Sequence, residues 1–392
     1  MTEHSQNSRI LILDVLRGFA IVAIMLLHNI EHFDVYHFPD HLPEWMKALD
    51  QKIWTSLFFL FGGKAYAIFA LLFGVTFSIQ LKNQEKRGQG FLGRFAWRML
   101  LLFCFGILNS AFFQGDVLSI YAVIGLLLIP MSKLSDKWIV LVAVCMMLLP
   151  VEWVNLFHAI QNPTQEIADP ISWTYFGRMW EYIPGNSVVH TMWGNLTNGK
   201  IAVLRWNWEN GRFFTIFGLF LFGYLLGKHE YFRWNDKTEL FWKKALLIAG
   251  IAFLPLFIVQ RNLSKLIESD IIRRSVETIE TAWTNFAFMV IMVAGLTILF
   301  QHKRVQKRLM YFTRFGKMSL SNYIIQSILG AIIYYGFGFG IYKYTGATYG
   351  ILIGLALTIL LGIFCKWWSG KYKHGPFETL WHKATWIGVK GR

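Results

Sequence analysis

Three ionisable residues lie in one long apolar run near the start of the chain, where an ionised side chain is costly unless it finds a partner or water. Asp14, Arg17 and His28 are separated by three and eleven positions. At 100° per residue, Arg17 and His28 differ by about 20° around a helix axis, and Asp14 lies about 60° from Arg17. The three side chains therefore share one face of a helix.

This shared face supports two interpretations. In the first, it is a polar track on which Arg17 contacts anionic groups at one end and His28, about 16 Å away, moves a proton at the other. In the second, Asp14 and Arg17 form a local ion pair that reaches one membrane interface, and His28 is a hydrated residue at the other. The sequence alone leaves both open.

A second apolar run contains Gly62-Gly63-Lys64-Ala65-Tyr66. Lys64 lies too deep in this run to reach water easily, so we expect it to pair with a carboxylate, first Asp116 and second Glu31. Such a pair would be either structural or catalytic. In the catalytic interpretation His28, Lys64 and Asp116 do the chemistry, and Asp14, Arg17, Glu31 and Tyr66 contact the substrate.

A polar stripe marks another apolar run, with Ser319, Asn322, Tyr323 and Gln326 at i, i+3, i+4 and i+7 of a helix. Such side chains either hold helices together by hydrogen bonds or line a cavity. If they line a cavity, Asn322, Tyr323 and Gln326 are candidates for substrate binding.

A group of possible metal ligands lies at the end of the first apolar run. His28, Glu31 and His32 lie at i, i+3 and i+4, a spacing compatible with zinc ligation. No second tight group of ligands accompanies them, so the sequence predicts no metal site and no firmly bound cofactor.

The elements that hold these residues are set by composition. The chain has 392 residues, of which 55% are hydrophobic and only 16% are charged, and its mean hydropathy is +0.42. These values are typical of an all-α integral membrane protein and not of a soluble domain. About ten apolar segments approach the roughly 20 residues that a spanning helix needs. They cover residues 10–30, 55–80, 95–113, 115–132, 138–158, 212–228, 241–260, 282–301, 319–340 and 346–366.

Lys and Arg decide the expected orientation of this polytopic helical bundle. With the N-terminus in the cytoplasm, Lys and Arg are more than twice as frequent in the cytoplasmic segments as in the opposite loops. This pattern accounts for the net charge of +15 and leaves nucleic-acid binding without support. We therefore expect a multi-pass membrane protein with both termini and the tail 367–392 in the cytoplasm.

The longest loop, residues 159–211, is expected outside the cytoplasm and is rich in Trp. Aromatic residues at this density predict either a folded cap that covers a site or an anchor lying at the membrane interface.

Several short runs, taken together and in order, resemble the YeiB-like family of bacterial membrane proteins. These runs are Asp14-Val15-Leu16-Arg17-Gly18-Phe19-Ala20, Gly63-Lys64-Ala65-Tyr66, Gly115-Asp116-Val117-Leu118 with Tyr121-Ala122, Gly316-Lys317-Met318-Ser319-Leu320-Ser321-Asn322-Tyr323 with Gln326 and Ser327, and Gly375-Pro376-Phe377-Glu378 with Trp381. In its first helices that family is similar to a wider superfamily of transmembrane acyltransferases. In one branch, which acetylates surface polysaccharides, an Arg and a His at the spacing of Arg17 and His28 are central. The resemblance thus implies acyl-donor contact for Arg17 and general-base or acyl-transfer duty for His28.

The function expected from these features is transfer of an acyl group from a cytoplasmic acyl-CoA donor, such as acetyl-CoA, to an unknown acceptor on the outer side. His28 would deprotonate the acceptor, Lys64 would stabilise the oxyanion, and Asp116 would orient Lys64. Two alternatives stay open: a transporter of a small amphiphile or acidic metabolite, and a non-catalytic scaffold. The sequence also leaves open whether the protein forms a homo-oligomer in the lipid bilayer.

Overall fold

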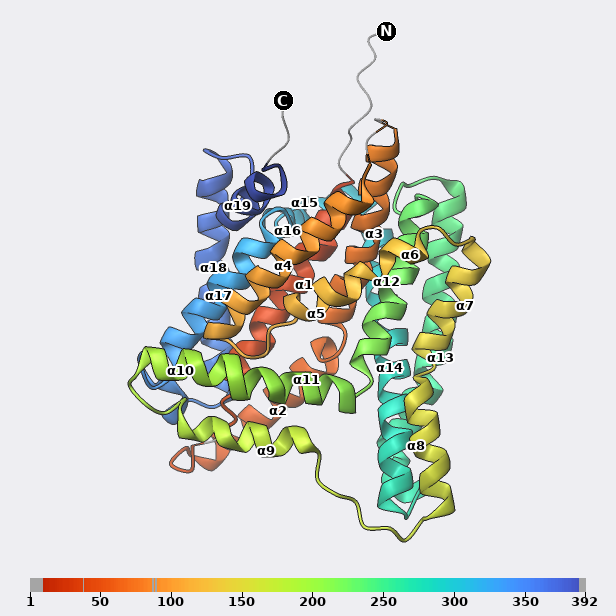
Figure 1. The fold of residues 1–392 in the computed structure, drawn as a ribbon. Coiled ribbons are helices and arrows are strands. Elements are labelled where there is room, and N and C mark those ends of the chain that lie inside the picture. The colour runs from red at the N-terminus through yellow and green to blue at the C-terminus, as the bar shows by residue number, and fades with distance from the viewer. Residues whose placement is uncertain (1–9, 38, 87, 89, 388–392) are drawn as a thin grey trace.

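The computed structural model describes residues 10–37, 39–86, 88 and 90–387. The extreme N-terminus and the last five residues of the expected tail, 388–392, lie outside the described residues. Within them every regular element is a helix, which confirms the predicted all-α class (Figure 1). The first eleven are α1 (Leu11–Ile30), α2 (Glu44–Phe61), α3 (Ala65–Glu85), α4 (Leu92–Phe112), α5 (Leu118–Leu126), α6 (Leu128–Met131), α7 (Asp136–Met147), α8 (Pro150–Gln161), α9 (Ile171–Gly177), η1 (Arg178–Glu181) and α10 (Val188–Gly194). The remaining ones are η2 (Asn195–Gly199), α11 (Lys200–Glu209), α12 (Arg212–Lys228), α13 (Asp236–Leu266), α14 (Asp270–Leu299), α15 (Lys303–Leu309), α16 (Phe312–Lys317), α17 (Ser319–Tyr334), η3 (Ile341–Lys343), α18 (Ala347–Ser369) and α19 (Pro376–Thr385).

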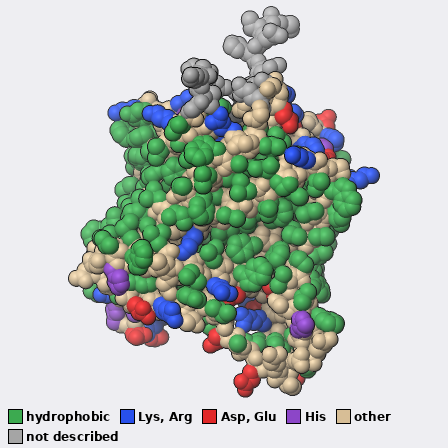
Figure 2. Space-filling model, viewed as in Figure 1, with side chains coloured by type: hydrophobic (Ala, Val, Ile, Leu, Met, Phe, Trp, Pro, Cys, Tyr) green, Lys and Arg blue, Asp and Glu red, His purple; other side chains and the backbone are tan. Residues whose placement is uncertain are grey.

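Six helices of the described chain are long and apolar enough to cross a membrane, or up to eight if each bent pair counts as one crossing. The six fall on expected spans: α1, α2 with α3, α4, α13, α14 and α18. The space-filling view shows a broad apolar band between two ends that carry most of the charged side chains, as expected for a protein in a bilayer (Figure 2). The coarse prediction of a helical membrane bundle is therefore supported, with six to eight candidate spans in place of about ten.

Proline accounts for the breaks in two of the expected spans that are not single long helices. Pro130 clashes with the carbonyl four residues earlier, and the expected span 115–132 consists of the short helices α5 and α6, which meet at Leu127. Pro150 is the first residue of α8, and α7 and α8 meet at an angle of 41°. The run 212–228 is bent by 72° from the helices before it, and α17 has only 16 residues.

Helix α1 is the centre of the bundle and packs against α3, α16, α17 and α18. Its closest neighbour is α16, where two glycines allow the backbones to touch. A Cβ on Gly18 would overlap the carbonyl oxygen of Phe312, and a Cβ on Gly316 would overlap that of Asp14. This contact fixes the height and rotation of α1, and with them the positions of Arg17 and His28.

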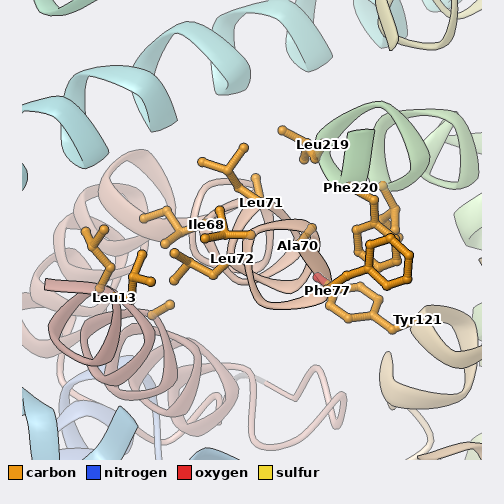
Figure 3. Packing of buried hydrophobic residues seen from close by; sticks show 14 of the residues in the cluster. Leu13, Ile68, Ala70, Leu71, Leu72, Phe77, Tyr121, Leu219 and Phe220 are labelled. Atoms are coloured by element: carbon orange, nitrogen blue, oxygen red, sulfur yellow. The ribbon is translucent and has the colours of Figure 1, made fainter. Parts of the chain in front are cut away.

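Helix α3 also packs against α1 and is covered by α12, and Tyr121 of α5 packs its ring near Phe69 and Phe73 of α3 (Figure 3). Leu13 of α1 lies near Ile68 and Leu72 of α3, while Phe77 and Tyr121 gather near Phe220 of α12. The apolar layers thus hold α1, α3 and α5 around the polar residues singled out above.

The Trp-rich segment 159–211 is folded. Its helices α9, η1, α10, η2 and α11 cross one end of the bundle, whereas the start of α1 and helix α19 lie at the opposite end (Figure 1). We call these five helices the cap and the opposite end the tail side.

Candidate functional site

Two cavities lie at opposite ends of α1. The tail-side cavity has a volume of about 360 Å³ and is lined by α1, α3, α4, α17 and α19. The cap-side cavity has a volume of about 480 Å³ and is lined by the end of α1, the α2–α3 break, the turn before α5 and the cap. Arg17 faces the first cavity and His28 the second, so the two ends of α1 serve different chambers.

The tail-side cavity is basic. Arg17 donates to Asp14 Oδ1 at 3.0 Å and to Thr76 Oγ1 at 3.1 Å. Arg98 lies with its guanidinium 4.5 Å from the ring centre of Trp381, and its buried Nε has no hydrogen-bond partner among the described residues. Lys317 adds a further positive charge, and two histidines, His374 and His382, also line this cavity.

The acid in the lining of this cavity is already engaged. The carboxylate of Glu378 accepts from the backbone nitrogens of Leu320 at 2.8 Å and Ser321 at 3.1 Å and from the Ser321 hydroxyl, so it caps the start of α17. Burial nevertheless raises the pKa of Glu378. Because Glu378 is committed to α17, Arg98 and Lys317 remain available for an anionic ligand.

The cap-side cavity has the opposite character. The His28 ring packs 4.6 Å from the ring of Phe113, and its buried Nδ1 has no hydrogen-bond partner within the described chain. Glu31 accepts a hydrogen bond from the Tyr36 hydroxyl at 3.0 Å. Burial and the nearby Asp34 raise the pKa of Glu31 to about 8, and burial raises that of Asp34 to about 6. An imidazole with a free Nδ1, in a cavity that also holds a protonated carboxyl group at neutral pH, is suited to proton transfer.

A thin wall separates the two cavities. The Val117 backbone nitrogen donates to the Tyr323 hydroxyl at 3.2 Å, and the Tyr121 hydroxyl donates to the Tyr66 carbonyl at 2.8 Å. Tyr323 and Tyr121 line the tail-side cavity, whereas Val117, Tyr66 and Asp116 line the cap-side cavity. We call these five residues the partition, because their hydrogen bonds join residues that line different cavities.

Asp116 is paired, but with a residue that the sequence did not indicate. Lys200, the first residue of α11 in the cap, reaches Asp116 Oδ2 at 3.3 Å and also donates to Ser119 Oγ at 2.5 Å and Ser110 Oγ at 3.1 Å. Asp116 also accepts from the Ser119 nitrogen at 3.0 Å and caps the start of α5. The prediction that Asp116 pairs with Lys64 is therefore wrong.

Lys64 lies elsewhere. Its ammonium is 5.6 Å from the ring centre of Phe288 and 5.9 Å from that of Phe59, and it makes no ion pair with any described residue. Gly63 and Ala65 line the cap-side cavity, but Lys64 does not. The backbone break at Gly63, where φ is +74°, separates α2 from α3 beside Lys64, a local geometry that a continuous helix pattern does not reveal.

The polar stripe of α17 serves more than one purpose. Ser319 and Tyr323 line the tail-side cavity. Asn322 donates to the Met318 carbonyl at 2.9 Å and lies against Cys365 of α18, as expected of a residue that joins helices. Gln326 is fully buried, and neither atom of its amide has a hydrogen-bond partner among the described residues. Some residues of the stripe therefore line the tail-side cavity, and others pack between helices.

Several lining residues escaped sequence reasoning. The sequence assigned Arg98 and Arg212 only to the charge balance of the loops, Lys317 only to that balance and to a family motif, and Asp34 to no role. Arg212 lies at the start of α12, with its guanidinium 4.0 Å from the ring centre of Trp206 and 4.5 Å from that of Tyr66. The available signal was the position of each charge at the end of an apolar run.

The cap contributes walls to the cap-side cavity through Trp173, Phe176, Trp206 and Asn207. Of the two interpretations of the Trp-rich segment, the structure thus favours the folded cover. Within the described residues, no group of three or more His, Cys, Asp and Glu side chains could hold a metal ion, so the donor set for such a site is missing there.

Comparison with known proteins places this architecture. Residues 226–388 match the family described as "Protein of unknown function (DUF418)". Over 97% of its length the chain is 27% identical to the uncharacterized protein YxaH of Bacillus subtilis, covering 95% of that protein. It is 23% identical to an uncharacterized 39.9 kDa protein of Bacillus acidopullulyticus, over 97% of this chain and 94% of that one. It is also 23% identical to the uncharacterized protein YeiB of Escherichia coli, over 95% of each chain. No solved structure matches. The chain is thus similar over nearly its whole length to YeiB and to the two Bacillus proteins, and these similarities support its resemblance to the YeiB-like family.

Proposed function

We propose that this protein is a membrane-embedded acyltransferase that takes an acyl group from an acyl-CoA donor at the tail side and passes it to an acceptor at the cap side. The observation that carries the proposal is the pairing of a basic cavity with a histidine-containing cavity across one thin partition. The proposal places the protein in the bacterial inner membrane, with its termini and the basic cavity in the cytoplasm, where acyl-CoA is made.

Arg98, Arg17 and Lys317 would bind the phosphates of the donor. The thioester end would pass between Tyr323 and Val117, which requires their 3.2 Å hydrogen bond to open. His28 would then take the proton of the acceptor hydroxyl or amine as this group attacks the thioester carbonyl. The carbon–sulfur bond breaks, the new ester or amide forms, and the thiolate leaves with the proton from His28.

The structure changes the residue that we propose for charge stabilisation. Lys64 does not line the cap-side cavity, whereas Arg212 does. Arg212 makes no ion pair with the described residues, so its N–H groups can stabilise the oxyanion. Asp116, with Lys200, keeps the start of α5 and the partition in place.

Binding of acetyl-CoA to purified protein tests the donor site. We expect one molecule bound per chain by isothermal titration calorimetry, and weaker binding in Arg98→Gln. Arg304→Gln is the matched control, because Arg304 is exposed on α15 and lines neither cavity. Unchanged binding in Arg98→Gln, or no binding by the wild type, would contradict the proposed donor site.

Release of free CoA thiol tests the chemistry. His28→Ala should bind acetyl-CoA as the wild type does and lose about 100- to 10,000-fold in turnover, the usual contribution of a general base. His158→Ala, which alters an exposed histidine on α8, should leave turnover unchanged. Equal turnover in the two variants would remove His28 from the mechanism.

Two chambers on either side of a partition are also the arrangement expected of a carrier that opens to each side in turn. The same titration separates the two functions. A carrier for a small amphiphile would bind its cargo without releasing CoA thiol, and acetyl-CoA would leave its thermal midpoint unchanged.

A further inference from the structure

A third cavity adjoins the cap-side cavity. It has a volume of about 400 Å³ and lies between the cap, the start of α12 and the outer half of α14. Tyr66, Trp173, Trp206 and Arg212 line both cavities. We call this third cavity the vestibule, because it shares walls with the cavity that His28 lines but is not itself lined by His28.

Arg212 forms the boundary between the two spaces. Its guanidinium is held between the rings of Tyr66 and Trp206 by cation–π contacts. The sharp 72° bend between α11 and α12, made at Gly211 with φ of +61°, positions Arg212 at the first turn of α12. A molecule in the vestibule would therefore meet free N–H groups of Arg212 before it reached His28.

The vestibule differs from the other two cavities in charge. Arg212 and Arg274 are balanced by Glu209 and Glu277, whereas the tail-side cavity is basic and the cap-side cavity is acidic. Glu209 is already engaged, because its oxygens accept from the Ser172 nitrogen at 3.1 Å and hydroxyl at 2.5 Å. Because the positive and negative side chains of the vestibule balance each other, neither a cationic nor an anionic ligand would gain much binding energy there.

The polar groups that face the vestibule include both donors and acceptors. The exposed carboxylate of Glu277 accepts, and the amide of Asn285 can both donate and accept. The Thr278 hydroxyl donates to the Arg274 carbonyl and can still accept, whereas the Thr281 hydroxyl accepts from Gln260 and can still donate. Trp173 is 59% exposed and offers a flat apolar face beside them. A neutral ligand with many hydroxyl groups satisfies such a wall, and its C–H faces can pack on the tryptophan ring.

We propose that the vestibule binds the neutral, polyhydroxylated body of the acceptor, a sugar residue or polyol, and directs one of its hydroxyl groups past Arg212 to His28. The direction of transfer rests on the proposed acyltransferase function, whereas the binding itself does not. In the transfer step the hydroxyl oxygen forms the ester, the thioester carbon–sulfur bond breaks, and the proton leaves with the thiol.

Protection of an introduced thiol tests the binding. Thr278→Cys places a thiol in the vestibule wall, in a background where Cys104 and Cys145 are serine. Labelling by a water-soluble maleimide should slow about threefold with trehalose or glucose at twice its dissociation constant. Choline chloride and inorganic phosphate at the same concentration should not slow it. The protein is held in nanodiscs, because sugar-based detergents would compete for the site.

Two controls make the result specific. Thr174→Cys lies on the exposed face of α9 outside the vestibule and should be labelled equally fast with and without sugar. Trp173→Leu should remove the protection of Thr278→Cys, whereas Trp193→Leu, at an exposed cap position that does not line the vestibule, should keep it.

Each outcome decides between the ideas. Protection by choline or by phosphate, or by no probe at all, overturns the assignment of a neutral polyhydroxylated ligand. Acetyl-CoA titration in the same nanodiscs is scored separately. Protection by sugar without acetyl-CoA binding would support the sugar site and contradict the acyltransferase function. Acetyl-CoA binding without protection by sugar would support the acyltransferase function and contradict the sugar site.

Discussion

Glu31 and Asp34 follow the end of α1 and face the cap-side cavity, where burial disfavours the charged form of both and Asp34 adds to the cost of ionising Glu31. Burial, and then repulsion from Asp34, moves the pKa of Glu31 from its ordinary 4.5 to about 8. The folded protein thus keeps a proton on Glu31 at pH values where the unfolded chain has lost it. Stability from this group is present at low pH and is lost as the pH rises through 8.

Replacing Glu31 by Gln tests this dependence. The thermal midpoint of the wild type should decrease as the pH is raised from 5 to 8. The free energy of unfolding should decrease by at most about 1.4 kcal/mol per pH unit over this range. Glu31→Gln, which carries no proton to lose, should show a flatter profile and a higher midpoint at pH 8. Differential scanning fluorimetry across this range gives both values.

Glu166→Gln serves as the control, because Glu166 is exposed in the connection before α9. Its profile should follow that of the wild type. If Glu31→Gln retained the full pH dependence, the proton on Glu31 would not be the source of it.

The buried charges also show where reasoning from single residues stops. The cost of an ion in a bilayer drew attention to Arg17, His28 and Asp116, and the structure gives Arg17 and Asp116 polar partners. The same rule could not supply the partner of Asp116, because Lys200 lies 84 positions away in a loop whose fold no local pattern specifies. The aromatic neighbour of Lys64 was equally hard to predict, because Phe288 belongs to α14, which is distant from Lys64 in the sequence.

Among the helices, the contact between α1 and α16 matters most for the site. Gly18 and Gly316 allow each backbone to touch a carbonyl oxygen of the other helix. A methyl group at either position has no room, because a backbone oxygen cannot rotate away as a side chain can. Arg17 precedes Gly18 directly, so its position in the tail-side cavity depends on this approach.

Gly18→Ala should therefore destabilise the protein by about 1–3 kcal/mol, the usual cost of overpacking. Gly250→Ala is the matched control, because nothing lies within 4 Å of a Cβ at that position of α13. It should be neutral or stabilising by up to about 1 kcal/mol through helix propensity. The two variants are compared by their thermal midpoints in the same detergent. Equal shifts would mean that the α1–α16 contact has room for a methyl group at position 18.

Element boundaries followed the apolar pattern where the runs were long. All six of the long candidate spans lie on predicted ones. The predictions were least accurate at α5 with α6 and at α7 with α8, where proline interrupts an apolar run without changing its hydropathy. Hydropathy counts apolar residues, whereas a span also needs an unbroken hydrogen-bond ladder.

At the scale of the whole molecule, orientation decides whether the proposed chemistry is reasonable. The cap and the tail side lie at opposite ends of the bundle (Figure 1), and the excess of Lys and Arg predicts that the tail side faces the cytoplasm. Only that orientation brings the basic cavity to the compartment that holds acyl-CoA.

Thiol labelling of intact cells tests the orientation. Asn186→Cys is at an exposed cap position and should react with a membrane-impermeant maleimide. Lys371→Cys, exposed after α18 at the tail side, should react only after the cells are permeabilised. The reverse pattern would place the cap in the cytoplasm and separate the basic cavity from its proposed donor.

The partition has a consequence for the cell that makes this protein. The backbone and hydroxyl groups of Tyr323, Val117, Tyr121 and Tyr66 are bonded to one another across the wall between the two cavities. An ion that crossed from one cavity to the other along this route would have to part these hydrogen bonds. We therefore expect an energised membrane to hold its proton gradient with the wild-type protein, and to leak protons when variants remove these bonds.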